Sequence, residues 1–296
     1  MEYRMLSNNV AIPMVGFGTF SINNEYLIKH SIETALTTGY RSIDTASIYG
    51  NEAWIGEELS QSRIPRENLF ITSKVWNHIT TYNGTIEAFE ESLLNLDTNY
   101  LDLYLIHWPA EGYQEKWRAL ETLYKSGKIK AIGVSNFEEE HLLALFKTAE
   151  IKPMIDQLET HPHFPQRRLN NFLNQYGIRH ESWSPLGRGQ KQLLNSSILK
   201  KIADKYHKTV PQIILRWHID RGLIIIPKST HSARIKENFE LFDFSLTIDE
   251  IAAINFLETD SRVDNSPLDQ HFLAESAQDK FFQQRMEMIK KENQSY

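Results

Sequence analysis

The sequence predicts an α/β fold in which eight parallel strands close into a single (β/α)8 barrel of the TIM type. Short apolar runs alternate with polar segments of helical spacing along the chain of 296 residues. The strand starts are spaced roughly 25 to 30 residues apart, an interval typical of a strand–helix unit. No linker, repeat or low-complexity tract divides the chain, so we expect residues 1–296 to form one domain.

The order of the predicted elements follows this alternation. Strands are predicted at residues 14–19, 41–44, 68–75, 101–108, 129–136, 154–159, 177–184 and 223–229. Helices are predicted at residues 25–39, 52–61, 85–96, 113–127, 138–149, 167–177 and 211–222, with an additional helix at 196–207 before the last strand. In the first of these helices the apolar side chains lie near one face, and Gly39 ends the pattern.

A doubly wound open sheet is the alternative to the barrel. Its nucleotide-binding form requires a glycine-rich turn after the first strand, but "GFGTFS" carries only the first half of G-x-G-x-x-G. No acidic residue follows at the distance that this motif requires. The pattern therefore favours the barrel.

Both ends of the chain are predicted to add structure to the barrel. Residues 2–13 have the pattern of a β-hairpin with Asn8-Asn9 at its turn, which would plug the barrel floor. Near the other end, apolar residues recur at roughly helical spacing. We therefore expect residues 272–296 to contain extra helical structure packed on the barrel through Phe281, Phe282, Met286 and Ile289.

Composition excludes several classes of function. The formal net charge of −6 provides no basic field for a nucleic-acid backbone. Without cysteine the chain has no disulfide, thiolate metal site or thiol nucleophile. The first residues lack the apolar core of a signal peptide, and no stretch reaches the ~18 apolar residues of a membrane span. We expect a soluble cytoplasmic protein, and a monomer because no apolar stretch demands a partner.

Polar side chains gather where the predicted strands end. The active site of an α/β barrel lies at the carboxyl ends of its strands. Each of these residues alone has an ordinary explanation as a turn former, a helix cap or a solvated side chain, but their convergence on one barrel mouth predicts a site. They are Asp44, Lys74, His107, Ser135, Asn136, Gln157, Trp183, Ser184, Lys228 and Ser229.

Three stretches carry a resemblance to a known family. In chain order they are "GYRSIDTASIYGNEAWIG", "KSGKIKAIGVSNF" and "IPKSTHSARIKENFEL". They resemble the three signatures of the aldo-keto reductases, and the similarity runs from about Met14 to Phe239. Trp183 and the short loop after residue 108 resemble the prokaryotic 2,5-diketo-D-gluconate reductase-like branch. The resemblance implies an enzyme that reduces aldehydes or ketones, including α-dicarbonyls and keto-sugars, to alcohols.

The resemblance implies a catalytic tetrad of Asp44, Tyr49, Lys74 and His107. Carbonyl reduction needs a hydride at carbon and a proton at oxygen, and Tyr49 would donate the proton. A free tyrosine has a pKa of ~10, and a cationic Lys74 beside it would lower that pKa. Asp44 would keep the lysine charged, and His107 would orient the substrate oxygen.

A nicotinamide cofactor must supply the hydride, because no side chain can. The resemblance implies that Ser135, Asn136 and Gln157 bind its carboxamide and that Trp183 stacks on its ring. Two cations and a hydroxyl, Lys228, Arg234 and Ser229, would receive a 2′-phosphate, so NADPH/NADP+ is favoured over NADH. The remaining implied cofactor contacts are Gly18, Thr19, Ser184, Leu186, Gly187, Glu237 and Asn238.

The substrate pocket is less defined by the resemblance. Phe20, Trp76 and Trp108 are expected to line an apolar entrance. Two positions depart from the family pattern, since Asp156 stands where asparagine is frequent and Phe20 where many members have tryptophan. The region after Ile254 matches poorly, which leaves the substrate open.

Two alternative functions come from other classes. A metal-dependent barrel hydrolase would use the His161–His163 pair with Asp156, Glu159 or His107, although no second histidine pair stands at the other strand ends. A regulatory barrel would keep the fold and bind the cofactor without turnover. The intact tetrad and the expectation of no metal site favour the reductase over both.

Overall fold

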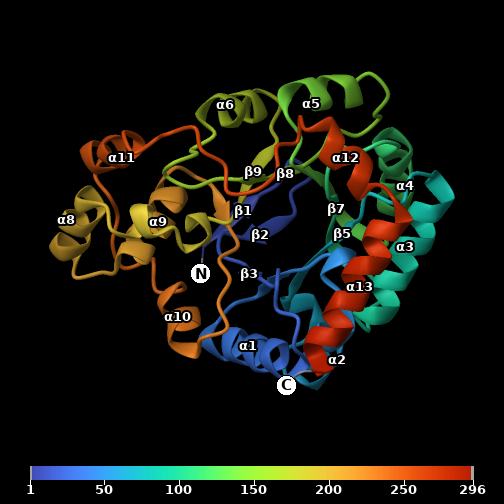
Figure 1. Ribbon diagram of the computed structural model, residues 1–296, viewed down its shortest axis with the longest axis horizontal. Coiled ribbons are helices and arrows are strands. Elements are labelled where there is room, and N and C mark those ends of the chain that lie inside the picture. Colours follow the sequence, from blue (N-terminus) through green and yellow to red (C-terminus); the bar gives the residue numbers. More distant parts are fainter. Residues whose placement is uncertain (1, 295–296) are drawn as a thin grey trace.

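The computed structural model describes residues 2–294, and its centre is a sheet of eight parallel strands surrounded by helices (Figure 1). Each strand pairs with its neighbour in chain order, from β3 to β10. The strands are β3 (Phe17–Gly18), β4 (Ser42–Asp44), β5 (Phe70–Val75), β6 (Leu101–Ile106), β7 (Ile129–Ser135), β8 (Ile155–Glu159), β9 (Arg179–Trp183) and β10 (Ile224–Ile225).

The two edges of this sheet meet and close the barrel. Val15, just before β3, forms a parallel bridge with Ile225 of β10. The amide of Gly16 donates to the Ile225 carbonyl at 2.8 Å, and the amide of Ile225 donates to the Met14 carbonyl at 3.0 Å. The strand order runs without reversal, whereas a doubly wound sheet reverses direction at its switch point. The predicted barrel is therefore confirmed.

The outer helices lie at the predicted positions, except for the last, α10 (Ser232–Glu237), which was not predicted. They are α1 (Glu25–Thr38), α2 (Glu52–Gln61), α3 (Tyr82–Asn95), α4 (Tyr113–Lys125), α5 (Glu139–Leu145), α6 (Arg167–Gln175), α9 (Val210–Asp220) and α10 (Ser232–Glu237). Additional helices are α7 (Lys191–Leu194), α8 (Ser197–Tyr206) and α11 (Ile248–Asn255), and short 3-10 turns are η1 (Ser47–Tyr49), η2 (Arg66–Asn68) and η3 (Gly187–Gly189).

Local signals explain where the elements begin and end. In α1 the side chain of Asn24 accepts from the amide of Leu27, and Gly39 with φ 123° ends the helix. The predicted last strand is too long, because only Ile224 and Ile225 pair as a strand. Pro227 has no amide hydrogen to extend the ladder, and its segment instead lines a cavity.

The N-terminal hairpin is confirmed and lies at the floor of the barrel. β1 (Tyr3–Met5) pairs antiparallel with β2 (Ala11–Pro13), and Asn9 takes a positive φ of 65° in the turn. The side chain of Asn8 donates to the Lys130 carbonyl at 2.8 Å, at the start of β7. The hairpin is therefore tied to the amino ends of the strands, opposite the mouth.

The C-terminal tail forms two helices, α12 (Gln270–Ser276) and α13 (Asp279–Gln294). Figure 1 shows α13 running along one side of the barrel toward α1 and α2. Phe281 stacks on Trp76 with ring centroids 6.0 Å apart, and Phe282 stacks on His78 at 4.2 Å. Ile289 is also buried. The predicted packed helix is confirmed for the described residues, while residues 295–296 lie outside them and the assignment of residues 1–296 to one domain stays a prediction.

Candidate active site

A tight turn after β4 brings an acid and a phenol to the barrel mouth. Asp44 is the last residue of β4, and Tyr49 ends the 3-10 turn η1. Gly50, in the left-handed region with φ 64°, ends that turn. A Cβ on Gly50 would lie 2.9 Å from the Cδ1 of Ile289, so glycine is required there for two reasons.

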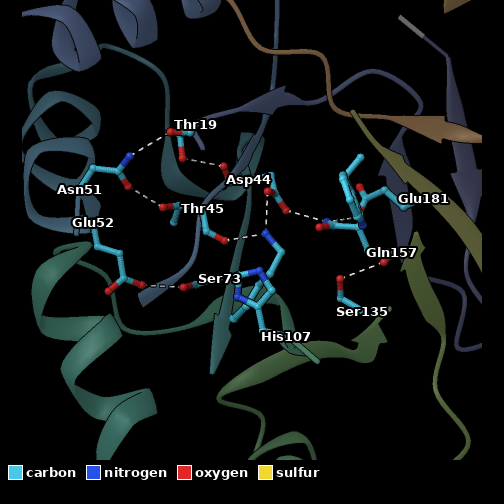
Figure 2. A network of polar contacts seen from close by, with 12 residues as sticks. Thr19, Asp44, Thr45, Asn51, Glu52, Ser73, His107, Ser135, Gln157 and Glu181 are labelled. Atoms are coloured by element: carbon cyan, nitrogen blue, oxygen red, sulfur yellow. Dashed lines mark hydrogen bonds and ion pairs between the residues drawn. The ribbon is translucent and has the colours of Figure 1, made fainter. Parts of the chain in front are cut away.

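Asn51 fixes this turn to its neighbours (Figure 2). Its amide nitrogen donates to the Thr19 carbonyl at 3.1 Å, and its oxygen accepts from the Thr45 hydroxyl at 2.8 Å. The Thr19 hydroxyl in turn donates to the Asp44 carbonyl at 2.9 Å. Thr19 therefore braces the backbone under the site.

Lys74 is fully buried and paired with Asp44. Its ammonium donates to Asp44 Oδ1 at 2.7 Å and to the Thr45 carbonyl at 2.8 Å. The same nitrogen lies 5.2 Å from the ring centroid of Tyr49. Burial by itself lowers the pKa of Lys74, but the charge of Asp44 and the hydrogen bond to it outweigh burial and raise the pKa above the usual value. Lys74 is therefore held as a cation.

Tyr49 is held as a neutral phenol. Burial raises the pKa of Tyr49 to about 12, although the adjacent ammonium of Lys74 opposes that rise. Lys74 acts on the pKa of Tyr49 in the predicted direction, but loss of hydration, which was not predicted, outweighs the attraction of one ammonium and makes the net shift upward. A protonated phenol at neutral pH is nevertheless the form that can donate a proton.

His107 faces the same space in its neutral form. Burial, reinforced by the positive charges of Lys74 and Lys116, places the pKa of His107 well below the usual value. Its ring lies edge-on to that of Tyr49, with centroids 5.6 Å apart, and edge-on to that of Trp76 at 4.9 Å. Its backbone carbonyl accepts from Asn136 Nδ2 at 3.0 Å.

Gln157 lies between two carboxyl groups (Figure 2). Its amide nitrogen donates to Asp44 Oδ2 at 2.8 Å and to Glu181 Oε2 at 2.7 Å. Glu181 is 1% exposed, and burial, followed by the charge of Asp44, raises its pKa to about 7. Sequence reasoning missed Glu181, yet it stands two residues before Trp183, and this spacing places both side chains on one face of β9.

Two strained residues hold the edge of β7 and β9. Asn136 has φ 63° and Ser184 has φ 47°, both in a region that non-glycine residues rarely occupy. Asn136 Oδ1 accepts from Trp183 Nε1 at 2.9 Å, and the Ser135 hydroxyl donates to the Gln157 carbonyl at 2.8 Å. The amide of Asn136 and the indole of Trp183 are thereby fixed beside the mouth.

One cavity of about 980 Å3 connects these groups. Three predicted residues do not line it: Lys74 lies beneath its wall, and Thr19 and Gly187 contribute no lining surface. The predicted residues that do line it are Gly18, Phe20, Asp44, Tyr49, Trp76, His107, Trp108, Ser135, Asn136, Gln157, Trp183, Ser184, Leu186, Lys228, Ser229, Arg234, Glu237 and Asn238.

The far end of the cavity contains two cations without carboxylate partners. Within residues 2–294, neither Lys228 nor Arg234 forms an ion pair, and burial lowers the pKa of Lys228. Ser229 lies between them in the chain and lines the same cavity. A Cβ on Gly18 would come within 2.8 Å of the Ile226 carbonyl, so the floor here is close-packed backbone. This end fits an anionic group such as a phosphate.

The fold and this geometry agree with a protein-family match. The model of the "Aldo/keto reductase family" matches residues 14–258. The chain belongs to the aldo/keto reductase family. Its predicted membership, read from the three signatures, is therefore confirmed, and α12 and α13 lie beyond the matched part.

Two curated bacterial relatives of this reductase are similar over most of their length. The glyoxal reductase of Bacillus subtilis is 49% identical over 88% of this chain and 95% of its own. The methylglyoxal reductase DkgA of Escherichia coli K12 is 42% identical over 88% of this chain and 95% of its own. The predicted similarity to the prokaryotic branch is consistent with both.

Solved structures of other aldo-keto reductases superimpose closely on this reductase. One from a Medee basin deep-sea metagenome has a TM-score of 0.87 and 42% identity, covering 90% of this chain and 98% of that one. The Bombyx mori enzyme in complex with NADP has a TM-score of 0.85 and 35% identity, covering 89% of this chain and 95% of that one.

The hydrolase alternative has no support in this reductase. His161 and Glu159 are fully buried and bonded to each other at 3.0 Å, and His163 contacts Gln190 at 3.2 Å. Within residues 2–294, no group of three or more metal-binding side chains is brought together. In the same part of the chain, no helix combines the length and apolar character needed to span a membrane.

Sequence reasoning missed several residues that line the cavity, including a group from the last part of the reductase. Phe272, Phe281 and Arg285 of the tail line the cavity, and so does Asp264, which forms an ion pair with Arg188. The aromatic spacing of the tail predicted a packed helix, but nothing in the sequence indicated which surface it covers. The remaining missed lining residues are Ser21, Ile48, Pro185, Arg188, Gly189, Leu194, Pro211, Ile226, Pro227 and Asn265.

Proposed function

We propose that the protein reduces small aldehydes and α-dicarbonyls to alcohols with NADPH, using Tyr49 as proton donor. One observation carries this proposal: a protonated Tyr49 beside a buried, charged Lys74 lines the same cavity as two cations without carboxylate partners, Lys228 and Arg234. The first pair suits proton donation and the second suits a cofactor phosphate.

The residues at the mouth fit a nicotinamide cofactor. Such a cofactor supplies the hydride when it is bound. Ser135, Asn136 and Gln157 line the cavity beside the tetrad and offer hydroxyl and amide groups for its carboxamide. Trp183 is half-buried, with its ring held by Asn136, and provides an aromatic face for the nicotinamide ring.

The chain's own residues then handle the proton. The Tyr49 hydroxyl would donate to the substrate carbonyl oxygen, and the ammonium of Lys74 would stabilise the phenolate left behind. Asp44 keeps Lys74 charged at the moment of transfer. Neutral His107 presents a ring nitrogen for the same oxygen without adding a competing charge.

The far end of the cavity favours NADPH over NADH. A 2′-phosphate would supply the anionic partner that Lys228 and Arg234 have not found within the described residues. The solved Bombyx mori and Gox0644 enzymes, similar to this chain, are complexes with NADP and NADPH.

The substrate side of the cavity is aromatic, which supports a small carbonyl compound as the substrate. Trp76 and Trp108 are buried there and pack with Phe281 and Phe272 of the tail. The glyoxal and methylglyoxal reductases named above share 49% and 42% identity with this chain, which supports 2-oxoaldehydes as substrates. We also propose that the protein is a cytoplasmic monomer. Gel filtration of the purified chain tests its oligomeric state.

The test is NADPH oxidation with glyoxal and methylglyoxal by the wild type and by Tyr49→Phe. Loss of the proton donor should lower kcat by a factor on the order of 10² or more and leave the Kd of NADPH unchanged. Tyr104→Phe is the matched control, because Tyr104 is also a buried tyrosine but does not line the cavity. Near-normal turnover by Tyr49→Phe would refute the assigned proton donor, and NADPH binding without turnover in the wild type would identify a regulatory barrel.

A further inference from the structure

Glu181 is a buried acid at the barrel mouth to which the family tetrad gives no part. It lies on β9 directly opposite Gln157 of β8, since the two residues are register partners in the parallel sheet. Only 1% of Glu181 is exposed, and its carboxyl accepts from Gln157 Nε2 at 2.7 Å. Burying a carboxyl costs free energy unless hydrogen bonds or a nearby charge compensate for the lost hydration.

We propose that Glu181 is a positioning residue that acts through Gln157. With Asp44 it engages both amide hydrogens of Gln157, so that only the amide oxygen remains for a ligand in the cavity. Gln157 then accepts a hydrogen bond from the carboxamide nitrogen of the nicotinamide. This inference rests on the proposed function, because it assumes that a nicotinamide cofactor binds at the mouth.

The orientation of the Gln157 amide follows from its neighbours. Asp44 is ionised in its pair with Lys74, so its free oxygen can only accept. Turning the amide over would place the Gln157 oxygen against this carboxylate oxygen at 2.8 Å, which is repulsive. No described residue donates to Gln157 Oε1, and the side chain lines the cavity.

The backbone of Gln157 is fixed as well. Its carbonyl accepts from the Ser135 hydroxyl at 2.8 Å and from the amide of Asn136 at 3.0 Å. Backbone and side chain are thus both held before a ligand arrives, so little conformational entropy is lost on binding. Asp44 of the tetrad restrains one amide hydrogen of the Gln157 side chain, and Glu181 restrains the other.

A purely electrostatic role for Glu181 is the competing explanation. Its charge also favours the charged form of Lys74, but less than that of Asp44, which is in direct contact at 2.7 Å. Glu181→Gln separates the two explanations, because glutamine keeps an acceptor oxygen for Gln157 and removes the charge. Glu181→Met removes both with little change in volume.

The first experiment measures the Kd of NADP+ by quenching of tryptophan fluorescence. Glu181→Met should weaken binding about 3- to 10-fold, the effect of one hydrogen bond, while Glu181→Gln stays within about twofold of the wild type. Glu52→Met is the matched control: Glu52 is a buried acid bonded to Ser73 that does not line the cavity, and its loss should leave the Kd unchanged.

A double-mutant cycle tests whether Glu181 acts through Gln157. The effect of Glu181→Met on the Kd of NADP+ should disappear in a Gln157→Leu background. A general structural role would instead add the same loss in both backgrounds. Additive losses would overturn the inference, even if each single variant binds weakly.

A cofactor analogue tests the same point and gives a decisive result even with the wild type alone. The analogue carries a carboxylate in place of the carboxamide, so it offers only acceptors to the Gln157 oxygen. The wild type should bind it at least about 10-fold more weakly than NADP+, and Glu181→Met should narrow this ratio, because one N–H of Gln157 becomes free to donate. Equal binding of the two cofactors by the wild type would overturn the inference even if Glu181→Met does not fold.

The outcomes separate this inference from the proposed function. A wild type that binds neither NADP+ nor NADPH contradicts the proposed function. If the wild type binds NADP+ but Glu181→Met has the same Kd, only the role of Glu181 is contradicted.

Discussion

Lys74 lies near the carboxyl end of strand β5 and Lys228 follows strand β10. The two lysines serve opposite ends of one cavity, but their surroundings differ. Lys74 is fully buried and has its counter-ion, Asp44, at 2.7 Å, so its pKa is raised despite burial. Lys228 has no ion pair with a described residue, and burial lowers its pKa. The protein itself supplies the counter-ion of Lys74, which can therefore act on Tyr49. Lys228 can instead bind the anionic group of a ligand.

Replacing Lys74 should produce the largest effect on stability and turnover, because it breaks the buried ion pair with Asp44. Lys74→Met leaves Asp44 buried without a counter-ion, and we expect the free energy of unfolding to fall by about 3–5 kcal/mol. Turnover should fall by a factor on the order of 10³, because the phenolate of Tyr49 loses its stabilising charge. Urea unfolding and NADPH oxidation measure the two effects.

The matched control is Lys29→Met, which removes a surface lysine paired with Glu25 and Glu57. Its loss should change stability by about 1 kcal/mol or less. If Lys74→Met were as stable as this control, Asp44 and Lys74 would not form the buried pair on which the comparison rests.

Replacing the cations at the other end should affect the ligand and not the fold. Arg234→Ala or Lys228→Met should raise the Kd of NADPH about 10- to 100-fold, as expected for a lost charge-assisted hydrogen bond. The Kd of NADH should change little, and the free energy of unfolding should not fall, because no pair within the described protein is broken. Equal losses for NADPH and NADH would mean that these side chains do not contact the 2′-phosphate.

Asp156 extends the comparison to a buried acid without a cation. It is fully buried, its Oδ2 has no hydrogen-bond partner in the described part of the chain, and burial raises its pKa well above the usual value. For an acid whose pKa is higher in the folded state, the contribution to stability is fully present below its unfolded pKa of ~3.9 and is lost progressively as the pH rises from there through the folded pKa.

Asp156→Asn should therefore stabilise the protein, with the smallest effect of the three. The gain in the free energy of unfolding over wild type should increase as the pH is raised from 5 toward 8, because asparagine needs no proton to be buried. Thermal unfolding of both proteins across this range measures the gain. A constant difference at every pH would show that Asp156 does not titrate on unfolding in this range.

The sequence predicted the parts of the site that depend on local pattern. Strand endings place Asp44 and Lys228 at one rim, and the rule for parallel barrels makes that rim the mouth. Glu181 was missed because it lies within a strand, where an acid draws attention only if its partner across the strand is known. The tail was predicted to be helical, but its contact with Trp76 joins residues about 200 positions apart, which no periodicity encodes. The lowering of the Tyr49 pKa by Lys74 was predicted, but the larger rise caused by burial was not, because sequence does not reveal how deeply a phenol is buried.

The position of α13 determines when the site can be completed during protein synthesis. The tetrad is present once His107 has been made, and the cofactor cradle once Asn238 has been made. The wall formed by Phe272, Phe281 and Arg285 follows later. Asn293 also accepts from the amide of Glu25 at 2.9 Å, which ties the end of α13 to the start of α1. A nascent chain that has folded its barrel therefore has the proposed catalytic groups and cofactor-binding residues before the wall formed by the tail.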